Sequence, residues 1–200
     1  IVTLYVSYGF NKKSLSAFIG ISLTLLFVGI LAQYAVHALH FTGLGSEESS
    51  FLLQEMAGKI DFVSLIIGGI IIAAIGVLDD VAITQASTVF ALHSMDSRIK
   101  HWELYKKAME VGKDHSSAVI NTLVLAYTGA ALPLVLLLSI GTDTNSTNIM
   151  SIEIVAEEIV RTLVSTSGLI LAVPITTMIA VFFAKRKNLQ NLQTGVLHKH

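Results

Sequence analysis

The chain has 200 residues, of which 53% are hydrophobic and only 14% are charged, and its mean hydropathy is +0.71. This composition excludes an ordinary soluble domain, because soluble domains carry more charge and less apolar surface. Cysteine is absent, which excludes disulfides and thiolate metal sites.

Four apolar stretches are long enough to cross a bilayer, since a spanning helix needs about 20 apolar residues. They cover residues 15–39, 61–92, 118–140 and 159–184, and residues 1–6 resemble the end of a fifth span. The first residue is Ile rather than Met, so we expect an upstream part to be missing. The predicted fold is an all-α polytopic transmembrane bundle, with one domain over residues 1–187 and a cytoplasmic tail over residues 188–200.

Basic residues are concentrated in three segments of the chain. Of the thirteen, only Lys59 and Arg161 lie outside residues 12–13, 98–113 and 185–199. If the spans alternate in direction, these three segments share one side of the membrane. The positive-inside rule makes that side cytoplasmic and places the C-terminus there.

The second span carries an acidic pair, Asp79-Asp80, in apolar surroundings. A carboxylate at that depth costs about 2.5 to 3.5 kcal/mol even on lenient scales, so the pair is the leading functional candidate. At 3.6 residues per turn, Asp80 shares a face with small residues above it and hydroxyls below it. These are Gly69, Ala73, Gly76, Thr84 and Ser87.

Asp79 points about 100° away from Asp80, toward an isoleucine-rich flank. We therefore predict that Asp80 is an interior carboxyl that binds a proton or cation, with Thr84 and Ser87 as relay or ligand groups and Asp79 in support. The alternative is that Asp80 is a structural hydrogen-bonding group that joins two spans.

Residues 101–111 place apolar side chains at helical spacing with lysines between them. This pattern predicts an amphipathic helix on the cytoplasmic surface. It is either an interfacial linker or a coupling element that moves with its neighbouring spans. Residues 47–57 on the outer side are predicted to form a short helix.

Polar residues within the third span are candidates to complete the site. Asn121 and Thr128 are seven residues apart and share a face, so we predict that both look into the bundle, with Tyr127 beside them. Each of these residues is also a candidate for an ordinary hydrogen bond between helices.

Both prolines of the chain, Pro133 and Pro174, lie within apolar spans, where proline frees a carbonyl and kinks a helix. We predict hinges there, with Thr176 and Thr177 following the second. Glu157 and Glu158 lie four and three residues before Arg161 at the outer end of the last span, spacings that favour a local ion pair. That pair is predicted to anchor the span at the interface or to act as a gate.

Several motifs occur in a fixed order along the chain: GVLDDVA at residues 76–82, ELYKKAM at 103–109, GKD at 112–114, NTLVLAY at 121–127, EIVR at 158–161 and VPITT at 173–177. Together they resemble the YibE/F family of prokaryotic integral membrane proteins, over about residues 60–184. The family's acidic element typically holds one acid, which matches Asp80, and Asp79 departs from it. The resemblance implies a multi-pass protein of the prokaryotic inner membrane.

The acidic span, the basic amphipathic helix and the two proline-bearing spans are also similar to half of the membrane domain of RND-type exporters and of SecD/SecF translocation proteins. This second resemblance implies that an intramembrane aspartate is a proton site paired with a lysine. No lysine lies inside a predicted span here. The relay would therefore need a second chain or the missing upstream part.

Three function classes follow from these observations. The first is a proton- or cation-coupled transporter or permease core, and the second is a non-transporting scaffold or assembly subunit. The third, an intramembrane aspartyl protease, needs two facing carboxyls, whereas adjacent aspartates on one helix diverge by about 100°. We predict the first class, no enzymatic activity and no cofactor. The expected partners are the lipid bilayer and a homo-oligomer or second membrane chain, without nucleic acid.

Overall fold

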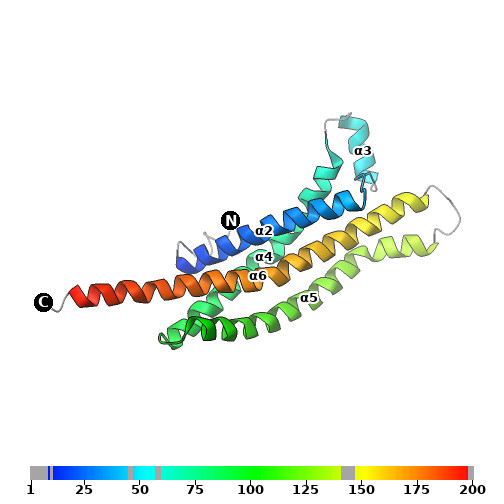
Figure 1. Ribbon diagram of the computed structural model, residues 1–200. Helices are drawn as coiled ribbons and strands as arrows, with labels where there is room; N and C mark the ends of the chain where they lie inside the picture. Colours follow the sequence, from blue (N-terminus) through cyan, green and yellow to red (C-terminus); the bar gives the residue numbers. More distant parts are fainter. Residues whose placement is uncertain (1–8, 10, 45–46, 57–59, 141–146, 198–200) are drawn as a thin grey trace. The chain divides into compact units, whose positions relative to one another are not determined.

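The computed structural model describes residues 9, 11–44, 47–56, 60–140 and 147–197. Over these ranges the chain is helical and has no strand, which confirms the all-α prediction (Figure 1). The four long helices are α2 (Lys12–Ala38), α4 (Phe62–Met95), α5 (His101–Ile140) and α6 (Thr147–Leu197). The shorter α3 (Glu47–Met56) is the short helix predicted on the outer side. Residues 1–6, the predicted end of a fifth span, lie outside the described residues.

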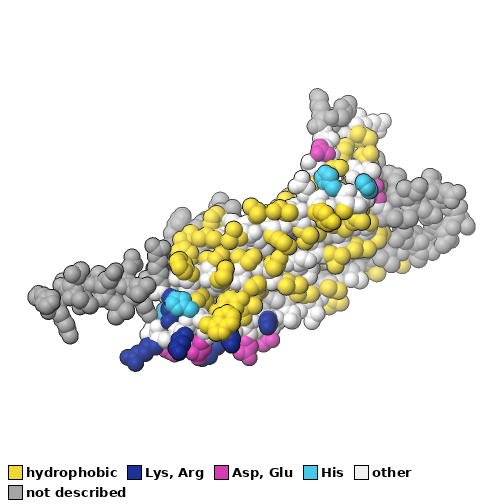
Figure 2. Space-filling view, in the orientation of Figure 1, with side chains coloured by type: hydrophobic (Ala, Val, Ile, Leu, Met, Phe, Trp, Pro, Cys, Tyr) yellow, Lys and Arg dark blue, Asp and Glu magenta, His cyan; other side chains and the backbone are white. Residues whose placement is uncertain are grey.

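Four of the described helices are long and apolar enough to cross a membrane, as predicted. The qualifying segments are Lys12–Ala38, Phe62–Met95, His101–Pro133 and Glu153–Lys185. Figure 2 shows hydrophobic side chains along the visible surfaces of the helices. Large apolar side chains such as Leu26, Ile72 and Leu125 are exposed. A surface of this kind suits lipid as the surrounding solvent, so the chain is an integral membrane protein.

The amphipathic segment at residues 101–111 is not a separate surface helix, because it is continuous with the third span in α5. Gly112 is the only strong helix breaker in the connection. The hydroxyls of Ser116 and Ser117 donate to the carbonyls four residues before them, at 2.7 and 2.8 Å, and so remain compatible with the helix. Leu104 and Ala108, on the apolar face of the segment, are fully buried against protein.

The described residues group into two compact units. The first unit comprises residues 1–26, 75–118 and 168–200, and the second comprises residues 27–74 and 119–167. Helices α2, α4, α5 and α6 each contribute one segment to each unit. The helical part of the predicted tail, residues 188–197, belongs to α6.

Small side chains form much of the core of the first unit. Six alanines from all four long helices are almost fully buried in one cluster with Ile21, Val89 and Leu104. Small residues allow helix backbones to approach closely, which matters in a membrane because packing and hydrogen bonds replace the hydrophobic effect. The alanines are Ala17, Ala82, Ala86, Ala108, Ala180 and Ala184.

In the second unit, the chain turns sharply between α2 and α3. Gly43 has a φ of 75°, a backbone conformation that residues with a Cβ rarely adopt. A methyl group there would also lie 2.8 Å from the backbone of Phe62. The second unit therefore requires glycine at this turn.

Candidate functional site

Asp79 and Asp80 lie near the middle of α4, in the first unit. Asp80 is exposed and Asp79 is half-buried. This orientation differs from the prediction of an interior Asp80. The reason is that an apolar face of α4, together with Gln85, packs against the other helices and leaves Asp80 on the surface. Within the first unit, the buried residues of α4 are Leu78, Val81, Ala82, Ile83, Gln85, Ala86 and Val89.

The small and hydroxyl residues predicted to share a face with Asp80 do follow the helical period, but they do not enclose its carboxyl. Gly76 is exposed and has open space beside it, whereas Thr84 and Ser87 are half-buried. Within the described residues, no hydrogen bond joins Asp80 to Thr84 or Ser87. Their role as relay or ligand groups therefore stays a prediction. Gly69 and Ala73, which lie on the same face nearer the start of α4, belong to the second unit.

A buried amide joins three helices of the first unit. Gln85 on α4 is 3% exposed, and its Nε2 donates to the Ala108 carbonyl on α5 at 2.9 Å and to Thr177 Oγ1 on α6 at 2.7 Å. The Thr177 hydroxyl in turn donates to the Val173 carbonyl at 2.6 Å. Thr177, predicted as a hinge residue, is thus part of a packed polar bridge between helices.

Gly112 on α5 provides the space for this bridge. A methyl group at Gly112 would lie 2.6 Å from both Gln85 Oε1 and Val173 Cγ1. Sequence reasoning missed Gln85, although it is the only amide between residues 81 and 92. An isolated amide in an apolar run is the sequence signal that could have identified Gln85 as a buried polar residue.

Thr176 lies where α2 and α6 approach closely in the first unit. The side chain is fully buried, and its Oγ1 has no hydrogen-bond partner among the described residues. A methyl group at Gly20 would lie 3.0 Å from Thr176 Cβ and 3.2 Å from its Cα. Gly20 is therefore the small residue that admits the α6 backbone at this crossing.

In the second unit, a groove of about 340 Å³ lies between α5 and α6. It brings together three residues of the predicted site, Tyr127, Thr128 and Glu158. The Thr128 hydroxyl donates to the Val124 carbonyl at 2.7 Å. Asn121 and Thr128 are both exposed, which differs from the prediction that they face the bundle interior. The remaining lining residues are Val124, Ala131, Val155, Ile159, Thr162 and Leu163.

The ion pair predicted at the start of the last span is confirmed. Arg161 Nη1 lies 2.9 Å from Glu158 Oε2, and both side chains are partly buried. The guanidinium also approaches α4, because a methyl group at Gly69 would lie 3.9 Å from Arg161 Nη2. Glu157 Oε1 is buried without a hydrogen-bond partner among the described residues. The gating role predicted for Glu158 and Arg161 stays a prediction.

Glu153, in the second turn of α6, bonds to the segment of chain that follows α2. Its Oε1 accepts hydrogen bonds from the N–H groups of Thr42 and Gly43, at 2.6 and 3.0 Å. The Thr42 hydroxyl lies 2.9 Å from both carboxylate oxygens. Sequence reasoning did not find this contact, because the partners are 110 and 111 residues apart in the chain.

The two prolines lie inside continuous helices, Pro133 within α5 and Pro174 within α6. Pro133 belongs to the second unit and Pro174 to the first, one turn before the Gln85–Thr177 bridge. The predicted hinge motion at these residues stays a prediction.

Comparison with known proteins gives one family. The model for YibE/F-like proteins matches residues 1–186. No curated protein and no solved structure matches the chain. The likeness to RND-type exporters and SecD/SecF therefore receives no support, whereas the match over nearly the whole chain shows that this protein belongs to the YibE/F-like family.

Proposed function

We propose that this membrane protein is the core of a proton- or cation-coupled transporter, in which the Asp80 carboxyl takes up and releases the ion. The observation that carries the proposal is the exposure of Asp80 near the middle of an apolar helix. An ionised carboxylate facing lipid at that depth costs about 2.5 to 3.5 kcal/mol. We therefore expect this surface of α4 to meet water or another polypeptide rather than lipid.

A second polypeptide would complete the site around Asp80. The open space beside Gly76, one turn from Asp80, would allow another helix to approach closely. We propose that this helix belongs to a second copy of the chain or to a second membrane protein. Asn121, Tyr127 and Thr128 would then serve as ligand groups elsewhere on the ion path.

We further propose that the protein resides in the inner membrane of a prokaryotic cell, with its C-terminus in the cytoplasm and without enzymatic activity. The three basic segments of the chain support this orientation. A fluorescent protein fused to the C-terminus should fluoresce if that end is cytoplasmic. An alkaline phosphatase fusion at the same place should be inactive.

Proton flux into proteoliposomes tests the role of Asp80. The purified protein is reconstituted with a pH-sensitive dye inside the vesicles, and an inside-negative potassium diffusion potential is applied. The wild type should acidify the interior faster than protein-free vesicles, and Asp80→Asn should abolish the difference. Asp79→Asn is the matched control, because it removes the same charge one residue away, and it should keep most of the flux.

Two results would contradict the transport proposal. One is an Asp80→Asn protein that is folded and monodisperse yet conducts protons like the wild type. The other is a wild type that conducts no more than empty vesicles.

The second candidate function is a non-transporting scaffold. The Gln85 bridge favours it, because a buried amide bonded to two other helices is the kind of group that fixes packing. A scaffold predicts no flux in the wild type, together with loss of oligomeric assembly in Asp80→Asn. Cross-linking in membranes measures that assembly.

A further inference from the structure

A surface groove of the first unit lies between the beginning of α5 and the last part of α6. It measures about 490 Å³, and we name it the aromatic groove. Its lining is largely exposed, since Trp102 is 65%, Met178 64% and Phe182 60% accessible. The lining residues are His101, Trp102, Tyr105, Met178, Val181 and Phe182.

A cation stands at the edge of the aromatic groove. Lys106 Nζ lies 5.4 Å from the centre of the Trp102 ring, within the range of a cation–π contact. Trp102 is itself stacked on Tyr105, with ring centres 5.5 Å apart and an interplanar angle of 7°. The ammonium is exposed, so its remaining donors are available to a ligand. The rings therefore fix one positive charge beside an apolar wall.

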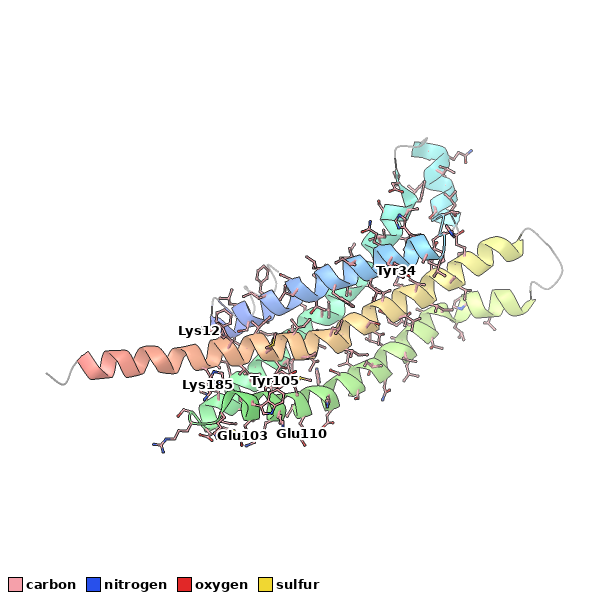
Figure 3. All side chains as sticks on the ribbon, viewed as in Figure 1. Lys12, Tyr34, Glu103, Tyr105, Glu110 and Lys185 are labelled. Carbon is pink, nitrogen blue, oxygen red and sulfur yellow. The ribbon has the colours of Figure 1, made fainter. Side chains whose placement is uncertain are left out.

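The surroundings of the groove carry more positive than negative charge. Glu103 is paired with Lys107 at 3.1 Å, and Lys185 on α6 donates a hydrogen bond to the Ile99 carbonyl. Figure 3 labels Glu103 and Tyr105 on α5 and Lys185 on α6. Figure 2 shows a cluster of basic and acidic side chains at this part of the first unit. The basic residues are Arg98, Lys100, Lys106, Lys107 and Lys185, and the acidic ones are Asp96, Glu103 and Glu110.

The position of the groove along α6 matches the boundary between hydrocarbon and headgroups. Met178, Val181 and Phe182 lie in the last turns of the apolar segment that ends at Lys185. Tryptophan is enriched at the level of the headgroups, where its ring meets both apolar and polar surroundings. This position would let the apolar wall meet acyl chains and let Lys106, beside Trp102, meet headgroup phosphates.

We infer that the aromatic groove binds one anionic phospholipid. An acyl chain lies along Met178, Val181 and Phe182, and the headgroup phosphate meets the Lys106 ammonium. Basic pockets between membrane helices on the cytoplasmic side bind anionic headgroups in this way. The Lys106 ammonium selects an anionic over a zwitterionic lipid. This inference is independent of the proposed transport function.

Trp102 is the only tryptophan of the chain, so its fluorescence reports on the groove directly. The 200-residue chain is reconstituted in phosphatidylcholine bilayers. Increasing fractions of a lipid with brominated acyl chains are added, either phosphatidylglycerol in one series or phosphatidylcholine in the other. Bromine quenches tryptophan on contact. We expect brominated phosphatidylglycerol to quench Trp102 with a relative association constant about fivefold higher than brominated phosphatidylcholine, the preference expected for one lysine near the surface.

Lys106→Gln should bring this ratio close to one. Lys113→Gln is the control, because it removes the same charge from an exposed position of α5 that lies about three turns away from Trp102, and it should leave the ratio unchanged. Quenching is normalised to the unquenched fluorescence of each variant. Equal quenching by the two lipids, or an equal loss in both variants, would overturn the inference. Absence of quenching by either lipid would show that protein covers the groove and would also overturn it.

Discussion

Gln85 on α4 donates a hydrogen bond to Thr177 on α6 over 2.7 Å, and both side chains are buried. The two residues are 92 positions apart in the chain. The same nitrogen also donates to the Ala108 carbonyl on α5. A single amide thus specifies which faces of three helices meet, in surroundings where no water competes for its hydrogen bonds.

Gln85→Leu should destabilise the protein. The change removes two hydrogen bonds between helices and keeps the side-chain volume similar, so we expect a loss of about 1 kcal/mol, given about 0.6 kcal/mol for each such bond in a membrane. Equilibrium unfolding in mixed detergent micelles measures it. Gln33→Leu on α2 is the control, because Gln33 is exposed. A loss in Gln33→Leu as large as that in Gln85→Leu would contradict the role of the bridge.

Gly112→Ala should destabilise the protein, although alanine is the better helix former. The added methyl group would meet Gln85 and Val173 at 2.6 Å, and overpacking of this kind costs about 1 to 3 kcal/mol. Gly129→Ala on the same helix meets nothing within 4 Å and should be neutral or stabilising by up to about 1 kcal/mol. Thermal unfolding of the two variants side by side tests this difference in stability. A Gly112→Ala protein as stable as the wild type would refute the prediction.

Gly43→Ala should disturb the turn between α2 and α3. The positive φ alone costs a residue with a Cβ about 1 to 2 kcal/mol, and the contact with the Phe62 backbone adds to it. The Gly43 N–H would also lose its hydrogen bond to Glu153 Oε1. Limited proteolysis should cut the variant near this turn. Gly68→Ala, with open space beside it, should resist proteolysis like the wild type, and equal cutting of both variants would count against the argument.

Asp61 should contribute a pH-dependent part of the stability. It caps α4 by accepting hydrogen bonds from the Val63 N–H at 3.1 Å and the Ser64 hydroxyl at 2.6 Å. The Ser64 bond holds the pKa of Asp61 below its ordinary value. The carboxylate therefore stabilises the fold fully above the unfolded-state pKa of about 3.9, and this contribution is lost as the pH falls through the lower folded-state pKa.

Thermal unfolding in detergent between about pH 5 and pH 2 checks this expectation, since the ordinary pKa of aspartate lies in that range. Asp61→Asn keeps a capping oxygen but cannot titrate, so its stability should fall less steeply with acid. Identical pH profiles for the variant and the wild type would show that other carboxyls control the acid sensitivity.

The sequence predicts the number and approximate place of the spans, because hydropathy over about 20 residues depends on composition alone. It predicts the Glu158–Arg161 pair for a similar reason, since three residues along a helix bring two side chains together. The continuity of α5 was not predicted. The lysines between residues 106 and 113 suggested a surface helix, whereas Leu104 and Ala108 pack against protein.

The orientation of Asp80 shows where periodicity stops being sufficient. The helical period gives the angles between side chains of one helix, but the neighbouring helices decide which face is buried. The contacts of Gln85 and Glu153 were missed because their partners lie far away in the chain, on other helices or in a connection. Such contacts depend on tertiary packing, which one sequence does not specify by local pattern.

We expect the exposed carboxyl of α4 to affect the insertion of the chain into the membrane as well. Two ionised aspartates at the centre of a helix raise the free energy of insertion by roughly 5 to 7 kcal/mol. Each of the seven isoleucines of α4 lowers it by at most about 0.6 kcal/mol. Of the long described helices, α4 alone carries adjacent acids at this depth. Helix α2 leaves the ribosome earlier, and its residues Ala17 and Ile21 share a buried cluster with Ala82 and Ile83 of α4. We expect α4 to enter the bilayer against α2, as a helical pair, during synthesis.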